Sequence, residues 1–212
     1  NGTHRVFTAW PVTTVGPNRL LPFRIADAGG YSSLMTKRYT DFMGYGQRSS
    51  TRFLDMMNVR YVIVSPKSAP GQVARATQVL QDGDVTVYER SGYLPRAYVV
   101  TEAKAVSSAR EALWALDAYG FDPARSVVIE GGPGDDGMGG RSDTATGRGG
   151  DEETRRYGDA GFRAEAAEIL TYEPQYVVVR AVAEMAGYLV LADTFYPGWE
   201  ARVDGKAAPI YR

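Results

Sequence analysis

The last quarter of the chain alternates short apolar runs with turn residues, and this pattern limits the fold more than any other feature. The runs are rich in β-branched and aromatic residues, and turn signals recur about every 8–12 residues, a spacing typical of β-sandwiches. They cover residues 164–172, 175–182, 188–193, 199–203 and 207–211. Between the last two runs lies Asp204-Gly205, a pair that tolerates the positive φ angles of a type I′ hairpin turn. The pattern therefore predicts a β-rich region built from short strands.

Two earlier strands and one helix are expected to belong to the same region. Residues 96–101 and 126–130 read as strands. Between them, Ala112, Leu113 and Leu116 recur at helical spacing and predict an amphipathic helix over 107–118. We therefore predict a β-sandwich-like domain with one crossing helix over residues 93–212.

The first 92 residues follow a different pattern. Apolar residues at spacings of three and four predict helices over 32–43 and 51–58. Residues 5–10, 59–64 and 85–90 read as strands, and the Gly and Pro residues of 91–95 interrupt the chain after them. This arrangement predicts a small α/β domain over residues 1–92, so the expected fold class of the whole chain is α+β.

A glycine-rich segment interrupts the second region. Nine glycines lie between residues 131 and 150, and Met138 is almost the only apolar residue among them. Such a segment cannot bury enough surface to offset the entropy lost on ordering, so we predict a disordered insertion over about residues 131–161. The segment Gly132–Gly137 matches G-x-G-x-x-G, but the residues after it cannot open the helix that a dinucleotide needs. One copy of a calcium-binding nonapeptide pattern is also insufficient, and we expect no cofactor.

Composition excludes several classes of function. The chain has no cysteine, which excludes thiolate chemistry, and a single histidine at position 4, which excludes metal sites with two histidines. Its net charge of -1 provides no long-range electrostatic attraction to nucleic acid. We expect no metal and no nucleic-acid partner. There is no run of 18 apolar residues to span a bilayer. The start has neither an initiator Met nor the apolar segment of a signal peptide, so we expect a piece of a larger protein.

Two groups of aromatic and charged residues are candidates for substrate binding, and in the favoured interpretation no residue is catalytic. Asp193, Tyr196 and Trp199 form the first group, and Tyr31 and Arg38 form the second. Aromatic rings beside a carboxylate suit a sugar. In the alternative interpretation, Trp199 packs in the core, the carboxylate of residue 193 caps a bend, and Tyr side chains on helices are core residues with a solvated hydroxyl.

Residues 193–206 of the tail read D-x-x-Y-P-G-W-x-A-x-V-D-G-K. This segment resembles one found near the C-terminus of YfhO-like bacterial membrane proteins. Residues 30–34 with 37–39 look like the family's G-Y-x-S-L…R-Y, and residues 54–63 look like its L-L-D-L-L-N-V-K-Y-V-I. Residues 94–97 resemble its L-P-R-A. These matches occur in the family's order and cover both predicted domains.

The resemblance implies a parent with many transmembrane helices, similar to GT-C-type glycosyltransferases that take sugars from a polyprenyl-phosphate lipid. The family's catalytic loop lies in its membrane half, so no catalytic residue is carried over here. We expect a non-catalytic module at the extracytoplasmic face of the cell membrane, partnered by its own transmembrane region and a glycan, glycolipid or cell-wall polymer. Two alternatives stay open: a structural or protein-docking domain without ligand, and a free-standing carbohydrate-active enzyme using Asp193, Glu200 or Asp204.

Overall fold

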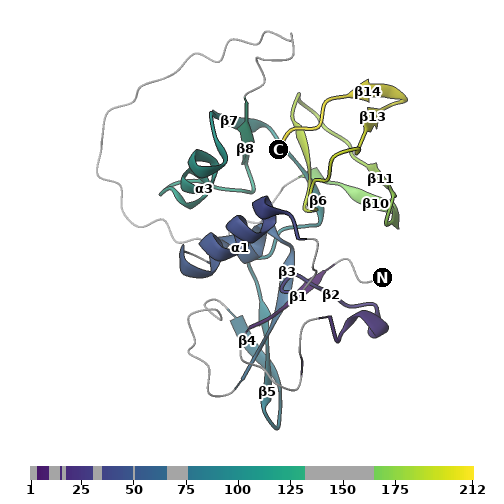
Figure 1. Ribbon diagram of the computed structural model, residues 1–212. Helices are drawn as coiled ribbons and strands as arrows, with labels where there is room; N and C mark the ends of the chain where they lie inside the picture. The colour runs from purple at the N-terminus through teal and green to yellow at the C-terminus, as the bar shows by residue number, and fades with distance from the viewer. Residues whose placement is uncertain are drawn as a thin grey trace.

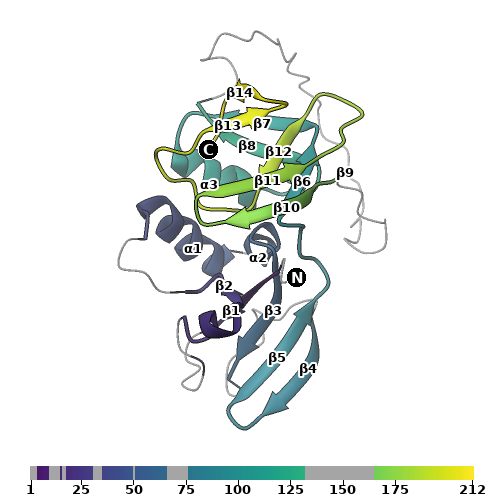
Figure 2. The ribbon, with the colours of Figure 1, turned by 90° about the vertical axis from the view of Figure 1, so that its right-hand side faces the viewer.

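The computed structural model describes residues 4–9, 15, 18–30, 35–49, 51–65, 76–131 and 165–212. These residues form a mostly β-stranded α+β fold, which confirms the predicted fold class. Their strands lie in one five-stranded sheet, one three-stranded sheet and three two-stranded sheets. We call the described residues up to 92 the first half and the later ones the second half. Figures 1 and 2 show the first half below and the second half above.

A mixed five-stranded sheet carries the first half, in the order β2-β1-β3-β5-β4. The strands are β1 (Arg5–Thr8), β2 (Ala26–Asp27), β3 (Val59–Val64), β4 (Ala76–Asp82) and β5 (Val85–Arg90). β1 runs parallel to β2 and β3, whereas β5 is antiparallel to β3 and β4. β3 and β5 have the predicted bounds. β4 was not predicted, because it is an exposed edge strand without an apolar alternation.

The described residues of the first half also form three helical segments. They are η1 (Leu21–Phe23), α1 (Lys37–Ser49) and α2 (Arg52–Met56). α1 begins later than predicted, because Thr36 accepts a hydrogen bond from the Tyr39 N–H through its hydroxyl oxygen, at 3.3 Å. It also continues past Met43, the predicted end, through two glycines. Ser32 and Ser33, where this helix was predicted to begin, lie outside the described residues.

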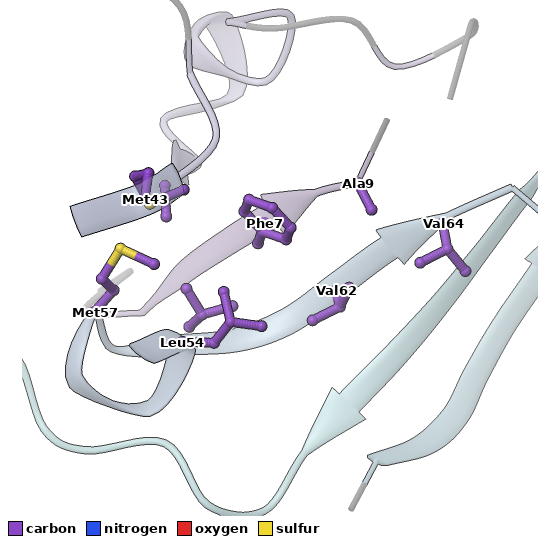
Figure 3. Packing of buried hydrophobic residues seen from close by; sticks show 9 residues of the cluster. Phe7, Ala9, Met43, Leu54, Met57, Val62 and Val64 are labelled. Carbon is purple, nitrogen blue, oxygen red and sulfur yellow. The ribbon is translucent and has the colours of Figure 1, made fainter. Parts of the chain in front are cut away.

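The core of the first half lies between the sheet and helices α1 and α2. Phe7 of β1 is paired in register with Val62 of β3, and both side chains are buried with Met43, Leu54 and further apolar residues (Figure 3). Directly after α2, Asn58 takes the left-handed conformation with φ 60° and turns the chain into β3. A short connection therefore keeps helix and strand packed on the same core.

The second half consists of smaller sheets. Its elements are β6 (Ala97–Val100), β7 (Glu102–Val106), α3 (Ala109–Asp117), β8 (Ser126–Glu130), β9 (Glu165–Ala166), β10 (Glu168–Glu173), β11 (Tyr176–Arg180), β12 (Tyr188–Leu191), β13 (Ala201–Val203) and β14 (Lys206–Ala208). β6 lies between β12 and β9, and α3 connects the parallel strands β7 and β8, which confirms the predicted crossing helix. β10–β11 and β13–β14 are hairpins (Figure 2).

Some predictions for the second half are confirmed by the structure and others are not. The turn at Asp204-Gly205 has φ angles of 50° and 78°, as predicted. A sandwich is not confirmed, because the described strands form small separate sheets, and no residue from 167 to 212 is buried. The predicted insertion falls almost entirely on residues 132–164, outside the described part of the chain. The domain boundary near residue 92 stays a prediction.

Candidate functional site

Three polar side chains from distant parts of the chain meet at Asp193, which follows β12. Its Oδ1 lies 2.7 Å from Nη2 of Arg5 in β1 and 2.7 Å from Nη2 of Arg96, just before β6. The hydroxyl of Tyr172, in β10, donates to its Oδ2 at 2.9 Å and also contacts Arg96. We call these four residues the Asp193 cluster. The cluster joins β1 of the first half to β6, β10 and β12 of the second half.

Backbone contacts hold the cluster in place. The N–H of Asp193 donates to the carbonyl of Leu191 at 2.7 Å, and the N–H of Ala192 donates to the carbonyl of Arg96 at 2.8 Å. Arg5 also donates through Nη1 to the carbonyl of Ala192, at 2.7 Å. The tight turn that ends β12 therefore aims the carboxylate at both guanidinium groups.

The cluster is partly buried and contains two positively charged arginines but one negatively charged carboxylate. The side chains of Arg5, Arg96 and Asp193 are 16%, 10% and 23% exposed. Burial, and next the charge of Arg96, lower the pKa of Arg5, while Asp193 raises it. The Nε of Arg96 is buried and has no hydrogen-bond partner among the described residues. The second guanidinium is therefore only partly satisfied.

Tyr172 is kept as a hydrogen-bond donor. Burial, and next the carboxylate of Asp193, raise the pKa of its hydroxyl, so the phenol stays protonated at neutral pH. Its ring lies 4.9 Å from the guanidinium carbon of Arg96, a cation–π contact. Both oxygens of Asp193 therefore accept hydrogen bonds from the protein itself.

The carboxylate of Asp193 is not free in the way a glycosidase carboxylate is, because both of its oxygens already accept hydrogen bonds from this chain. A glycosidase needs a second carboxyl group about 5–10 Å from the first, across the sugar. The other acidic residues of the tail, Glu200 and Asp204, are exposed, and neither takes part in the contacts of Asp193. Among the described residues no group of three or more acidic or histidine side chains is arranged to hold a metal ion.

The other predicted site residues are not part of the cluster. Tyr196, three residues after Asp193, is about half exposed and is one of the groups that raise the pKa of Tyr39, after burial and Asp27. Trp199 is half-buried and closes a turn through its N–H to the carbonyl of Tyr196 at 3.4 Å. Arg38 instead forms an ion pair with Glu130 at 2.5 Å. Tyr31 lies outside the described residues.

Arg5, Arg96 and Tyr172 were not predicted as site residues. A signal for Arg96 was present, because it is the arginine of the L-P-R-A segment. The other two had none, since an arginine at a strand start and a tyrosine in a hairpin are ordinary in sequence. Only pairing across the chain brings them to Asp193.

Further polar contacts join the two halves. Asn58 is 1% exposed and donates through Nδ2 to the carbonyl of Leu94 at 2.7 Å. Arg52, in α2, donates to the carbonyl of Leu116 in the last turn of α3 at 3.0 Å and to that of Ala118, directly after α3, at 3.1 Å. The junction therefore rests on buried or partly buried hydrogen bonds as well as on the Asp193 cluster.

The fold and this site define an α+β protein whose two halves are joined by charged and polar contacts. Searches against protein-family models, curated proteins and solved structures found no match to the chain. In the part of the chain that the structure describes, no helix is long and apolar enough to cross a membrane.

Proposed function

We propose that this chain is a non-catalytic, extracytoplasmic region of a YfhO-like polytopic membrane protein. In this role it assists the transfer of sugars from a polyprenyl-phosphate lipid to a cell-envelope glycan or polymer. The observation that carries the non-catalytic part is the state of Asp193, the first residue of the tail pattern. Two arginines and a tyrosine occupy its carboxylate, so it is not free to act as a nucleophile or base.

The resemblance gains support from where its segments meet. Asn58, from the segment 54–63, donates to Leu94 of the segment 94–97. Arg96, from that second segment, pairs with Asp193 of the tail. The three segments that resemble the family are far apart in the sequence but contact one another in the structure. This is expected if the family's patterns encode a junction between the two halves.

The surroundings of the cluster suit an acidic or phosphorylated sugar. The arginines exceed the carboxylate by one charge, and arginine is well suited to binding phosphate. Tyr172 and Tyr196 are each about half exposed and offer aromatic faces with hydroxyl groups. A ligand at this edge would gain from both features without needing the carboxylate of Asp193.

One observation favours a second candidate, a structural domain without ligand. Asp193 pairs with Arg5 of the first half and Arg96 of the second, which is the arrangement expected of an ion pair that holds two halves together. Measurement of substrate binding separates the two candidates.

The test uses the full-length parent in a sugar-transfer assay, with thermal stability measured on the same samples. Asp193→Asn is expected to lower stability but to leave transfer per folded molecule within about threefold of wild type, since no proton transfer is lost. Glu200→Gln, at the exposed acidic residue of the tail, is the matched control and is expected to change neither. A loss of transfer of about a thousandfold with unchanged stability would show that Asp193 is catalytic.

Ligand binding is tested by the double variant Tyr172→Ala/Tyr196→Ala in the same assay. We expect a higher KM for the sugar-lipid donor with kcat unchanged, because the aromatic faces bind ground state and transition state alike. An unchanged KM in a folded double variant would favour the structural candidate.

A further inference from the structure

The described segment just before β2 exposes large apolar side chains. Leu21, Phe23 and Ile25 are 57%, 73% and 38% exposed. Pro22 and Arg24, which alternate with them, are exposed as well. Figures 1 and 2 show η1, within this segment, projecting from the edge of the sheet beside β2. We call residues 19–25 the apolar loop.

The loop closes on its own backbone. The N–H of Phe23 donates to the carbonyl of Leu20 at 3.1 Å, and the N–H of Arg24 donates to the carbonyl of Leu21 at 2.9 Å. Arg24 takes a left-handed conformation, with φ 59°, that a residue with a side chain seldom adopts. Its own turn therefore shapes the loop and leaves the apolar side chains in solvent.

The charge next to these side chains is positive. Arg19 precedes the exposed apolar residues and Arg24 lies between Phe23 and Ile25. No acidic residue occurs from position 16 to 26. Both arginines are themselves exposed. The chain as a whole has a net charge of -1, so this basic and apolar combination is a local feature and not a reflection of the overall composition.

The small apolar area and the positive charge of the apolar loop indicate what kind of partner it binds. A stable protein interface buries about 800 Å² on each partner, which three side chains on one loop do not supply. Insertion into the headgroup region of a bilayer needs only a few apolar side chains with basic residues beside them. We propose that the apolar loop inserts Leu21, Phe23 and Ile25 into the surface of an anionic lipid bilayer, with Arg19 and Arg24 on the lipid phosphates.

The test is co-sedimentation of the 212-residue chain with phosphatidylcholine vesicles that contain or lack phosphatidylglycerol. We expect binding to the anionic vesicles and a loss of more than about tenfold in the partition coefficient for Leu21→Ser/Phe23→Ser. Arg19→Gln/Arg24→Gln is expected to weaken binding by about fivefold for each arginine and to reduce its sensitivity to salt. The control is Val182→Ser/Met185→Ser, which changes two similarly exposed apolar residues elsewhere and is expected to bind as wild type.

Three results would overturn the proposal: no binding to anionic vesicles, unchanged binding by the Leu21/Phe23 variant, or an equal loss in the control. Self-association that depends on Leu21 and Phe23, without vesicle binding, would also overturn it and assign the loop to a second copy of the chain. Because sugar transfer by the parent is a separate measurement, failure here leaves the proposed function standing.

Discussion

Replacing Asn58 removes two properties that no other common residue combines. The residue is 1% exposed, has a φ of 60°, and donates through Nδ2 to the carbonyl of Leu94 at 2.7 Å. Asn58→Ala leaves that carbonyl without its buried donor, at about 1–3 kcal/mol. Alanine in the left-handed region costs about 1 kcal/mol more. We therefore expect the free energy of unfolding to fall by about 2–4 kcal/mol, the sum of these two effects.

Asn58→Gly separates the two effects, because glycine adopts the left-handed conformation freely but has no donor. We expect it to be more stable than Asn58→Ala by about 1 kcal/mol and still less stable than wild type. Urea unfolding followed by circular dichroism measures both variants. Equal stability of the alanine and glycine variants would refute the backbone part of the reasoning, and a wild-type stability for both would refute the whole of it.

Two further predictions concern α1 and the N-terminal strand. A Cβ at Gly46 would lie 2.6 Å from Cβ of Phe53, whereas one at Gly44 would meet nothing within 4 Å. Gly46→Ala should therefore destabilise by about 1–3 kcal/mol and Gly44→Ala should stabilise by about 1 kcal/mol, in the same unfolding assay; the reverse order would contradict the packing described. Burial, and next the charge of Arg60, lower the pKa of His4 below 6.5, so the unfolded chain takes up the proton first and stability should fall as pH drops below 6.5 toward the folded pKa. NMR titration of this single histidine checks the direction, and a pKa above 6.5 would refute it.

Local patterns in the sequence were sufficient for much of the fold. β3, β5 and β8 have the predicted bounds because each is a short β-branched run between clear turn signals. The Asp204-Gly205 turn followed from the φ preferences of its residues. Strands β4 and β7 were missed, because both are largely exposed: β4 has no apolar alternation, and in β7 the alternating apolar residues are small alanines.

The site was less accessible to prediction from sequence. Asp193 was singled out with neighbouring aromatic residues, but its contacts come from positions 5, 96 and 172. Pairing over such distances depends on the sheet topology, which local propensity does not encode. Arg38 was assigned to substrate binding on its position beside tyrosines, whereas its contact is an ion pair with Glu130 at the end of β8.

The claim that Asp193 holds the two halves together is tested most directly by a double-mutant cycle on this chain. Asp193→Asn leaves two partly buried guanidinium groups close together, so adding Arg5→Gln should cost less in that background than in wild type. We predict a coupling free energy of at least about 1 kcal/mol between Arg5 and Asp193. The exposed pair Glu168–Arg180 serves as the control and should couple close to zero. A coupling between Arg5 and Asp193 no larger than that of the control would contradict the account.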